Sequence, residues 1–300
     1  MKTILLKHDD IDKSKWDECV NHSPNGLIYA ESVYLDAMAP GWQGIIADDY
    51  SAVMPLCHRS KLGIPYLYQP AFCQQGGIFF KTGTIQDYEA DFFQILKSHY
   101  RFAEINLNFS HENFADINPL KKGNNYLRLL SVKGYPDYIN VRLRRLRKFE
   151  MKYRITGDFK NIITAYRLLY ANRISSITRQ DFDGFTRLCQ KLHNEGRLIM
   201  REVWDVNEKK LLASCILLSG QGRIYNLINN LFPEGRPKLA NYFLFQQIFE
   251  EFAESGKIFD FEGSDLKGVG YFYEKFSTGN QPFYKFRYNN LPGYIKWLKG

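Results

Sequence analysis

The stretches that decide the fold are FDFEGS at residues 259–264 and YFYEKF at residues 271–276, near the end of the chain. The first alternates apolar and polar side chains, which is typical of a β-strand, and its Gly-Ser pair ends the strand. The second indicates a short helix that begins after Gly268. Phe272 and Phe276 lie four residues apart and therefore share one face of that helix.

The segments before this unit continue a mixed pattern of strands and helices. Thr178 is a predicted helix N-cap, and Gly196 is the predicted end of the same helix. From residue 152 to residue 288 the predicted order is strand, two helices, three strands, helix, strand, helix, strand. The expected bounds are strand 152–156, helices from 159 to about 172 and from 178 to 196, strands 198–205, 211–218 and 223–229, helix 240–255 and a final strand 283–288.

The first half of the sequence repeats this order. A hairpin is predicted around Asp48, with strands at 44–47 and 52–59, followed by strands 66–68 and 77–80, a helix at 87–99 and a strand at 103–109. Corresponding positions in the two halves are separated by nearly constant offsets. We infer two tandem domains, residues 1–135 and 136–300, each with a mixed central sheet flanked by helices.

Composition limits the class of protein. The chain has 300 residues, of which 45% are hydrophobic, and it includes 23 Phe and 20 Tyr, enough for substantial cores. Its five cysteines form no close pair, so neither a disulfide framework nor a zinc site is predicted, and no other metal-ligand spacing occurs. No signal peptide or membrane span is apparent. We expect a cytoplasmic α/β (α+β) protein without stable membrane insertion.

The net charge of +8 is unevenly distributed. Between Arg142 and Arg154 there are seven basic residues and one acid, Glu150. The helical spacing of apolar residues predicts that much of this segment forms a basic helix. Its charge predicts an anionic partner. We predict that Arg142, Arg145 and Lys148 contact a nucleic acid, a phosphate-bearing donor or a phospholipid surface.

The element order and the Tyr-Glu-Lys helix resemble the GNAT N-acyltransferase fold. The tandem arrangement with a basic helix between its halves resembles the FemABX-like peptidyltransferase superfamily. This resemblance covers nearly the whole chain. It implies transfer of an acyl or aminoacyl group from acyl-CoA or aminoacyl-tRNA to an amine, without a metal, with peptidoglycan precursors as acceptors in characterised members. It also implies a degenerate acceptor-side first domain and a donor-side, catalytic second domain.

The resemblance assigns a general acid to Tyr273, which would protonate the leaving group. Asp260 and Glu262 alternate with phenylalanines, so both carboxylates are expected on one face of the strand. One of them would accept a proton or bind the substrate amine.

A donor-binding loop is expected at residues 234–241, where the GNAT fold holds a pyrophosphate. Arg236 fits that pattern, but Leu239 stands where glycine is usual. Arg236, Lys238 and the start of the next helix could hold an anion. Asn229 and Asn241 complete the predicted donor site, with backbone N–H groups near Leu227 to Asn230 holding the carbonyl oxygen.

An acceptor site is predicted in the first domain. Polar and aromatic residues gather there around a Pro/Gly-rich stretch facing a cleft, which would suit a peptide or sugar. The candidate residues are Tyr68, Gln69, Gln74 and Gln75.

Three functions follow from these observations. The first is an N-acyltransferase or aminoacyltransferase of Fem-like type in cell-envelope metabolism. The second is a small-molecule N-acyltransferase that uses acyl-CoA. The third is a non-catalytic protein that retains the fold and binds RNA or another anion.

Overall fold

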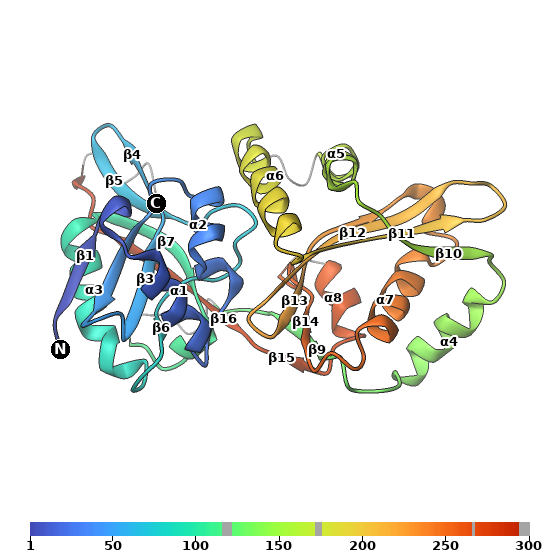
Figure 1. Cartoon of the computed structure of the whole chain (residues 1–300), viewed down its shortest axis with the longest axis horizontal. Helices are drawn as coiled ribbons and strands as arrows, with labels where there is room; N and C mark the ends of the chain where they lie inside the picture. The colour runs from blue at the N-terminus through green and yellow to red at the C-terminus, as the bar shows by residue number, and fades with distance from the viewer. Residues whose placement is uncertain (116–121, 172–175, 266–267, 294–300) are drawn as a thin grey trace. The chain divides into compact units, whose positions relative to one another are not determined.

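The computed structural model describes residues 1–115, 122–171, 176–265 and 268–293. The chain divides into two compact units (Figure 1). The first comprises Met1–Gly123 and Pro282–Gly300, and the second comprises Asn124–Gln281.

The second unit is built on one seven-stranded sheet. Within it, β13 and β14 run parallel, while the other neighbouring strands are antiparallel. The strand order is β10 (Met151–Ile155), β11 (Leu198–Asp205), β12 (Leu211–Gly220), β13 (Arg223–Leu231), β14 (Ile258–Asp260), β9 (Tyr126–Leu129) and β15 (Gly279–Asn280).

Helices cover both faces of this sheet, as Figure 1 shows. One face is covered by α5 (Phe159–Tyr170) and α6 (Arg179–Asn194), and the other by α7 (Ala240–Glu251) and α8 (Val269–Glu274). The basic helix α4 (Asp137–Leu146) contacts α7. An aromatic core fills the α7 side, where Phe245, Phe259 and Phe261 are fully buried.

Local signals explain where these helices begin and end. The predicted cap at Thr178 is confirmed: its hydroxyl and the Asp181 carboxylate form a reciprocal capping box at the start of α6. The predicted stop at Gly196 is also confirmed, since Gly196 adopts a left-handed backbone with φ of +70°.

The first unit contains two sheets. Three helices pack with them: α1 (Lys13–His22), α2 (Ser32–Met38) and α3 (Gln86–His99). One sheet has the order β1 (Thr3–Leu6), β2 (Gln43–Ala47), β3 (Ala52–Leu56) and β6 (Phe79–Phe80). The other has the order β4 (His58–Lys61), β5 (Ile64–Tyr68), β7 (Phe102–Leu107), β16 (Phe283–Asn289) and β8 (Lys122–Gly123).

The sequence analysis missed the start of the first unit. Strand β1 and helices α1 and α2 precede the predicted hairpin, so the first unit has a strand and two helices that correspond to β10, α5 and α6 of the second. Short 3₁₀ helices complete the described elements, at His8–Asp10, Ile28–Ala30, Phe109–His111 and Pro233–Gly235.

The strand that closes each unit comes from the other half of the sequence. β9 precedes residue 135 but pairs with β14 and β15 in the second unit. β16, the predicted last strand of the second domain, pairs with β7 and β8 in the first unit. The units therefore differ from the predicted ranges 1–135 and 136–300, because strand pairing depends on partners far away in the sequence.

Two predicted strands are shorter than expected. The strand that begins at Phe259 ends at Asp260, because Glu262 and Gly263 adopt left-handed backbone conformations with φ of 54° and 56°. The regular alternation that would place Asp260 and Glu262 on one face of a strand therefore does not extend to Glu262. The predicted strand 52–59 divides at Cys57 into β3 and β4, which belong to different sheets.

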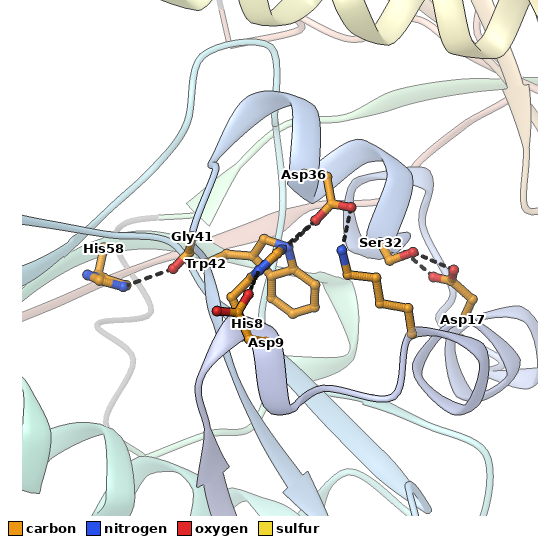
Figure 2. A network of polar contacts seen from close by, with 9 residues as sticks. His8, Asp9, Asp17, Ser32, Asp36, Gly41, Trp42 and His58 are labelled. Carbon is orange, nitrogen blue, oxygen red and sulfur yellow. Dashed lines mark hydrogen bonds and ion pairs between the residues drawn. The ribbon is translucent and has the colours of Figure 1, made fainter.

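A polar network braces the start of the first unit, as Figure 2 shows. The Asp36 carboxylate accepts hydrogen bonds from His8 Nε2 at 2.9 Å, Lys13 Nζ at 2.7 Å and Trp42 Nε1 at 3.0 Å. Burial acts to raise the pKa of Asp36, but these three donors hold it below its ordinary value. The network joins the segments on either side of α1 and α2.

Candidate active site of the second unit

The two parallel strands of the second unit separate shortly after they pair. β13 pairs with β14 only from Arg223 to Tyr225, although β13 continues to Leu231. The register with β12 also shifts, from Ile228 directly to Asn226, so Leu227 forms a β-bulge. A bulged residue leaves the regular hydrogen-bond ladder. Backbone groups near Leu227 are thus placed at the opening between the parallel strands.

Tyr273 lies at this opening. Its side chain comes from α8 and stacks on Phe261, with ring centroids 5.1 Å apart. Asn226 Nδ2 lies 3.2 Å from the Tyr273 hydroxyl and 3.3 Å from the carbonyl oxygen of Phe261. Asn226 is the residue immediately before the bulge, so the phenol lies where the strands separate.

The surroundings of Tyr273 favour its neutral form. The side chain is 7% exposed, and burial raises the pKa of its phenol, an effect that the Asn226 amide only partly offsets. Tyr166, Tyr170 and Glu262 act in the same direction as burial, because negative charge on them disfavours a phenolate. A protonated phenol can donate a proton but cannot act as a base without first losing it.

Side-chain amides gather around the same opening. Asn241 Nδ2, at the start of α7, donates to Asn229 Oδ1 at 3.0 Å. Asn230 Nδ2 donates to the carbonyl oxygen of Ile162 at 2.9 Å and to Ser214 Oγ at 3.0 Å. Within the described parts of the chain, six buried amide atoms have no hydrogen-bond partner, and four of them belong to these asparagines: Asn226 Oδ1, Asn229 Nδ2, Asn230 Oδ1 and Asn241 Oδ1.

Unpartnered buried amide atoms are costly, and in native proteins they usually have a reason. Asn226 contacts α8, and Asn229 contacts α7, which lies on the same face of the sheet as α8. The bulge between them allows residues three apart on a strand to share that face. This face therefore offers both hydrogen-bond donors and acceptors to a polar ligand.

Asp260 lies in a buried ion pair. Its Oδ2 accepts from Arg223 Nη1 at 3.1 Å and from Asn125 Nδ2 at 3.1 Å, and Oδ1 accepts from the Glu262 backbone N–H at 3.2 Å. Burial raises the pKa of Asp260, while Arg223 and Asn125 favour the charged form. Its side chain is about 1% exposed. These contacts favour a structural role for Asp260, and its catalytic role stays a prediction.

Glu262 is 8% exposed and lies close enough to Tyr273 for its charge to raise the pKa of the phenol. Its left-handed backbone turns it out of the strand. The predicted role of Glu262 in proton transfer also stays a prediction.

The predicted phosphate loop contains a residue with a left-handed backbone, and the ammonium group of its lysine is already paired with two acids. Leu239 adopts the left-handed conformation, with φ of 56°, that glycine favours. Lys238 Nζ lies 2.5 Å from Asp205 and 2.6 Å from Glu208, which raises the pKa of Lys238. Both acids belong to the β11–β12 turn region, so Lys238 braces this loop internally. Arg236 is exposed and makes no ion pair with any residue of the described chain.

The predicted acceptor residues separate into two groups. Tyr68 and Gln69 line a cavity of about 760 Å³ in the first unit, with cationic lining from Lys122, Lys285 and Arg287. Gln69 also fixes the following loop, since its amide bonds Cys73 O at 2.6 Å and the Asn106 N–H at 2.8 Å.

Gln74 and Gln75 are not part of that cavity lining. They bond each other at 2.6 Å, and Gln74 O accepts from Asn106 Nδ2 at 2.8 Å. Gln75 is 1% exposed. Both residues therefore hold the loop, and their role toward an acceptor stays a prediction.

The basic helix α4 has its apolar residues inward and its cations outward. Ile139 and Leu146 are buried, whereas Arg142 and Arg145 on the helix, and Lys148 just after its end, are exposed. Among the residues that the structure describes, these three cations form no ion pair. Arg142 lines a cavity of about 410 Å³ with three tyrosines. Arg145 and Lys148 are not among its lining residues.

Asn226 is the residue that the sequence analysis overlooked. β13 is a buried strand, and its sequence RIYNLINNL carries three asparagines. Amides are unusual in such a strand, and that signal could have singled out Asn226 with Asn229 and Asn230.

The described residues contain no group of three or more His, Cys, Asp or Glu side chains arranged to hold a metal ion. They also contain no helix with the length and apolar character needed to cross a membrane.

The two units define the class of fold. Each contains a strand followed by two helices, β1 with α1 and α2 in the first and β10 with α5 and α6 in the second, and one parallel strand pair, which is the arrangement of a tandem GNAT fold. The solved structure of FemX is similar over the full length of both chains, with a TM-score of 0.67 at 12% identity. The predicted fold is thus confirmed.

Other solved structures share the fold. The C-terminal domain of a putative lysylphosphatidylglycerol synthetase from Agrobacterium fabrum matches 96% of this chain and 94% of its own, with a TM-score of 0.57 at 11% identity. A tandem GNAT protein from the clavulanic acid biosynthesis pathway matches 97% and 100%, with a TM-score of 0.54 at 8% identity. The sequence matches no family model and no curated protein sequence.

Proposed function

We propose that this protein transfers an acyl or aminoacyl group to an amine at the opening between β13 and β14. The observation that carries the proposal is the hydrogen bond between Asn226 and the Tyr273 hydroxyl, directly beside the bulge at Leu227. It combines a buried neutral acid, a strand opening and backbone groups released from the sheet. These are the parts that acyl transfer requires.

The proposed reaction has a simple proton balance. The amine nitrogen attacks the acyl carbon, a C–N bond forms, and the C–O or C–S bond to the leaving group breaks. Tyr273 gives its proton to the leaving oxygen or sulfur, and the proton lost by the amine returns to the phenolate. A backbone N–H near Leu227 stabilises the negative oxygen of the tetrahedral intermediate.

The loop before α7 bears on the choice of donor. Lys238 is engaged by Asp205 and Glu208, and Leu239 replaces the usual glycine, so this loop offers a diphosphate little beyond Arg236 and the start of α7. We therefore favour an aminoacyl ester over acyl-CoA as donor. A peptidoglycan-precursor peptide is the proposed acceptor, by analogy with the Fem-like resemblance.

The test is the Tyr273→Phe variant in a transfer assay. Purified protein is supplied with a pool of aminoacylated tRNA or with acetyl-CoA, together with peptidoglycan-precursor peptide, and loss of the donor ester or thioester is followed. We expect turnover to fall by ~10²–10⁴, the range typical for loss of a positioned acid. Donor binding should be unchanged.

Tyr135→Phe is the matched control. Tyr135 packs in the same aromatic core, and its ring lies 6.1 Å from Phe276. Each variant removes one phenol oxygen, at a cost of about 0.5–1.5 kcal/mol of stability at most. Equal turnover in both variants would remove Tyr273 from the mechanism. Binding of RNA without any transfer would favour the non-catalytic alternative.

A further inference from the structure

The cavity that Arg142 lines in the second unit lies among α4, α7 and α8. It has a volume of about 410 Å³, and its lining residues come from these three helices and from the residue that follows α8. The lining residues are Tyr138, Arg142, Tyr242, Tyr271, Glu274 and Lys275. Tyr273 is not among them, so this cavity is separate from the proposed transfer site.

The aromatic walls are unusual because two of them are exposed. Tyr271 is 66% exposed and Tyr138 is 52% exposed, although large aromatic side chains are normally buried. The third ring is fixed, since Tyr242 packs against Phe272 at 5.1 Å and Phe276 at 5.5 Å. Exposed rings beside a fixed ring form a surface on which another planar ring can stack.

The exposed rings are also held in place. The Tyr138 hydroxyl donates to the Lys275 carbonyl oxygen at 3.3 Å, which links α4 to the end of α8. Lys275 Nζ lies 4.0 Å from the centre of the Tyr271 ring, a cation–π contact. A cavity with ordered walls binds a rigid ligand with less loss of conformational freedom.

The charge of the lining favours a ligand with an anionic group. Arg142 and Lys275 oppose a single acid, Glu274. Arg142 makes no ion pair or hydrogen bond within the described chain. Its guanidinium presents donors whose geometry matches a phosphate.

We propose that this cavity binds a nucleotide, with the base among the tyrosines and the phosphate on Arg142. The combination of stacking surfaces and a guanidinium fits a planar ring that carries a phosphate. The nucleotide could be a free mononucleotide or an unpaired nucleotide of an RNA strand. The proposal does not depend on the transfer reaction.

The experiment is calorimetric titration of the full chain at 150 mM salt with AMP, adenosine, inorganic phosphate and hexa-adenylate RNA. The decisive pair of variants is Arg142→Gln and Arg144→Gln. They remove the same charge from α4, but Arg144 does not line the cavity. Tyr271→Ala removes an exposed ring without touching the core.

We expect AMP to bind the unmodified chain more tightly than either adenosine or phosphate. Arg142→Gln should lower the affinity for AMP at least tenfold and change the affinity for adenosine by less than twofold. Arg144→Gln should change neither affinity by more than twofold. Tyr271→Ala should lower the affinities for AMP and for adenosine alike, by roughly five- to a hundredfold, as loss of a stacking partner does.

The titration with hexa-adenylate RNA distinguishes a free nucleotide from a nucleotide of an RNA strand. Hexa-adenylate that binds at least tenfold more tightly than AMP, with the same dependence on Tyr271, identifies RNA as the source. Equal affinities identify a free nucleotide. The proposal is overturned if AMP shows no binding, if inorganic phosphate binds as tightly as AMP, or if Arg142→Gln and Arg144→Gln act equally.

Discussion

At the scale of single residues, two histidines of the first unit have pKa values shifted in opposite directions. The Ile78 N–H donates to His111 Nε2 at 3.1 Å, so this nitrogen carries no proton, and Nδ1 lies 3.0 Å from Glu89 Oε1. His111 is fully buried, and burial lowers its pKa below the ordinary 6.5. His8 is partly exposed, and its hydrogen bond to Asp36 raises its pKa above 6.5.

The His111 arrangement predicts a loss of stability in mild acid. A folded pKa below 6.5 means that the unfolded chain binds the proton more readily, so this stabilisation is complete above pH 6.5 and declines as pH falls below it. His111→Gln keeps a donor and an acceptor but does not titrate. We expect its melting temperature to fall less between pH 7 and pH 5 than that of the unmodified protein; parallel curves would contradict this.

His8 predicts the opposite dependence. Because its folded pKa lies above 6.5, its contribution is complete below pH 6.5 and is lost as pH rises through the folded pKa. His8→Gln should therefore lower the melting temperature at pH 5.5 and have a smaller effect at pH 8.5. Thermal denaturation at both values measures this, with His22→Gln, an exposed histidine of α1, as the control. A larger effect at pH 8.5 would refute it.

The candidate site was predictable from sequence only in part. Tyr273 follows from the strand and Tyr-Glu-Lys helix, which are local features. Asn226 was missed because its contact with Tyr273 joins residues 47 positions apart. The pairing of Lys238 with Asp205 and Glu208 was missed for the same reason, since side-chain partners across such separations depend on the completed fold.

At the scale of elements, α8 is held close to the loop before it by a glycine. A Cβ atom on Gly270 would lie 2.1 Å from the backbone carbonyl oxygen of Ser264, a distance that real contacts do not show. This close approach seats the short helix that carries Tyr273. Its sequence has no capping side chain at Gly268 to do so.

Gly270→Ala should therefore displace α8. We expect a loss of about 1–3 kcal/mol in unfolding free energy, as for other overpacked positions, together with reduced transfer activity. Gly157→Ala is the matched control, because nothing lies within 4 Å of its Cβ position, and it should change stability by less than about 1 kcal/mol. Urea unfolding of both variants decides the matter, and equal effects would contradict the close-approach argument.

Elements with strong local signals were predicted most accurately. Helix α6 has a capping box at one end and a left-handed glycine at the other, and its bounds were found from these residues. By contrast, β14 is shorter than predicted because the apolar alternation of residues 259–262 continues past the point where Glu262 turns left-handed. Alternation alone does not reveal where backbone pairing stops.

At the scale of the whole molecule, each unit is closed by a strand from the other half of the sequence. β16 supplies Tyr284 and Phe286 to the core of the first unit, and both are buried. It also covers the edge of β7 along six residues. The order of elements was predictable, but the sheet that β16 joins was not, since pairing between distant strands leaves no periodic signal.

A chain shortened after Gln281 should lose the first unit selectively. Without β16, the β7 edge is unpaired and two core aromatic residues are missing. We expect fast amide hydrogen exchange in β5 and β7, with unchanged protection in β11 and β12. A chain that ends at Asn290 keeps β16 and is the control. Uniform loss of protection in both units would contradict this division.

The placement of β9 and β16, each in the unit formed mainly by the other half of the sequence, also sets an order for folding on the ribosome. Residues 124–281 contain every strand of the second unit, and all of them emerge before residue 282. The first unit is translated first, yet its β7 edge must wait for residues 283–289 before it gains its last neighbour. An unpaired strand edge is a template for association with other chains. Until residues 283–289 have been made, the first unit is therefore the part of this nascent chain in greatest need of a chaperone.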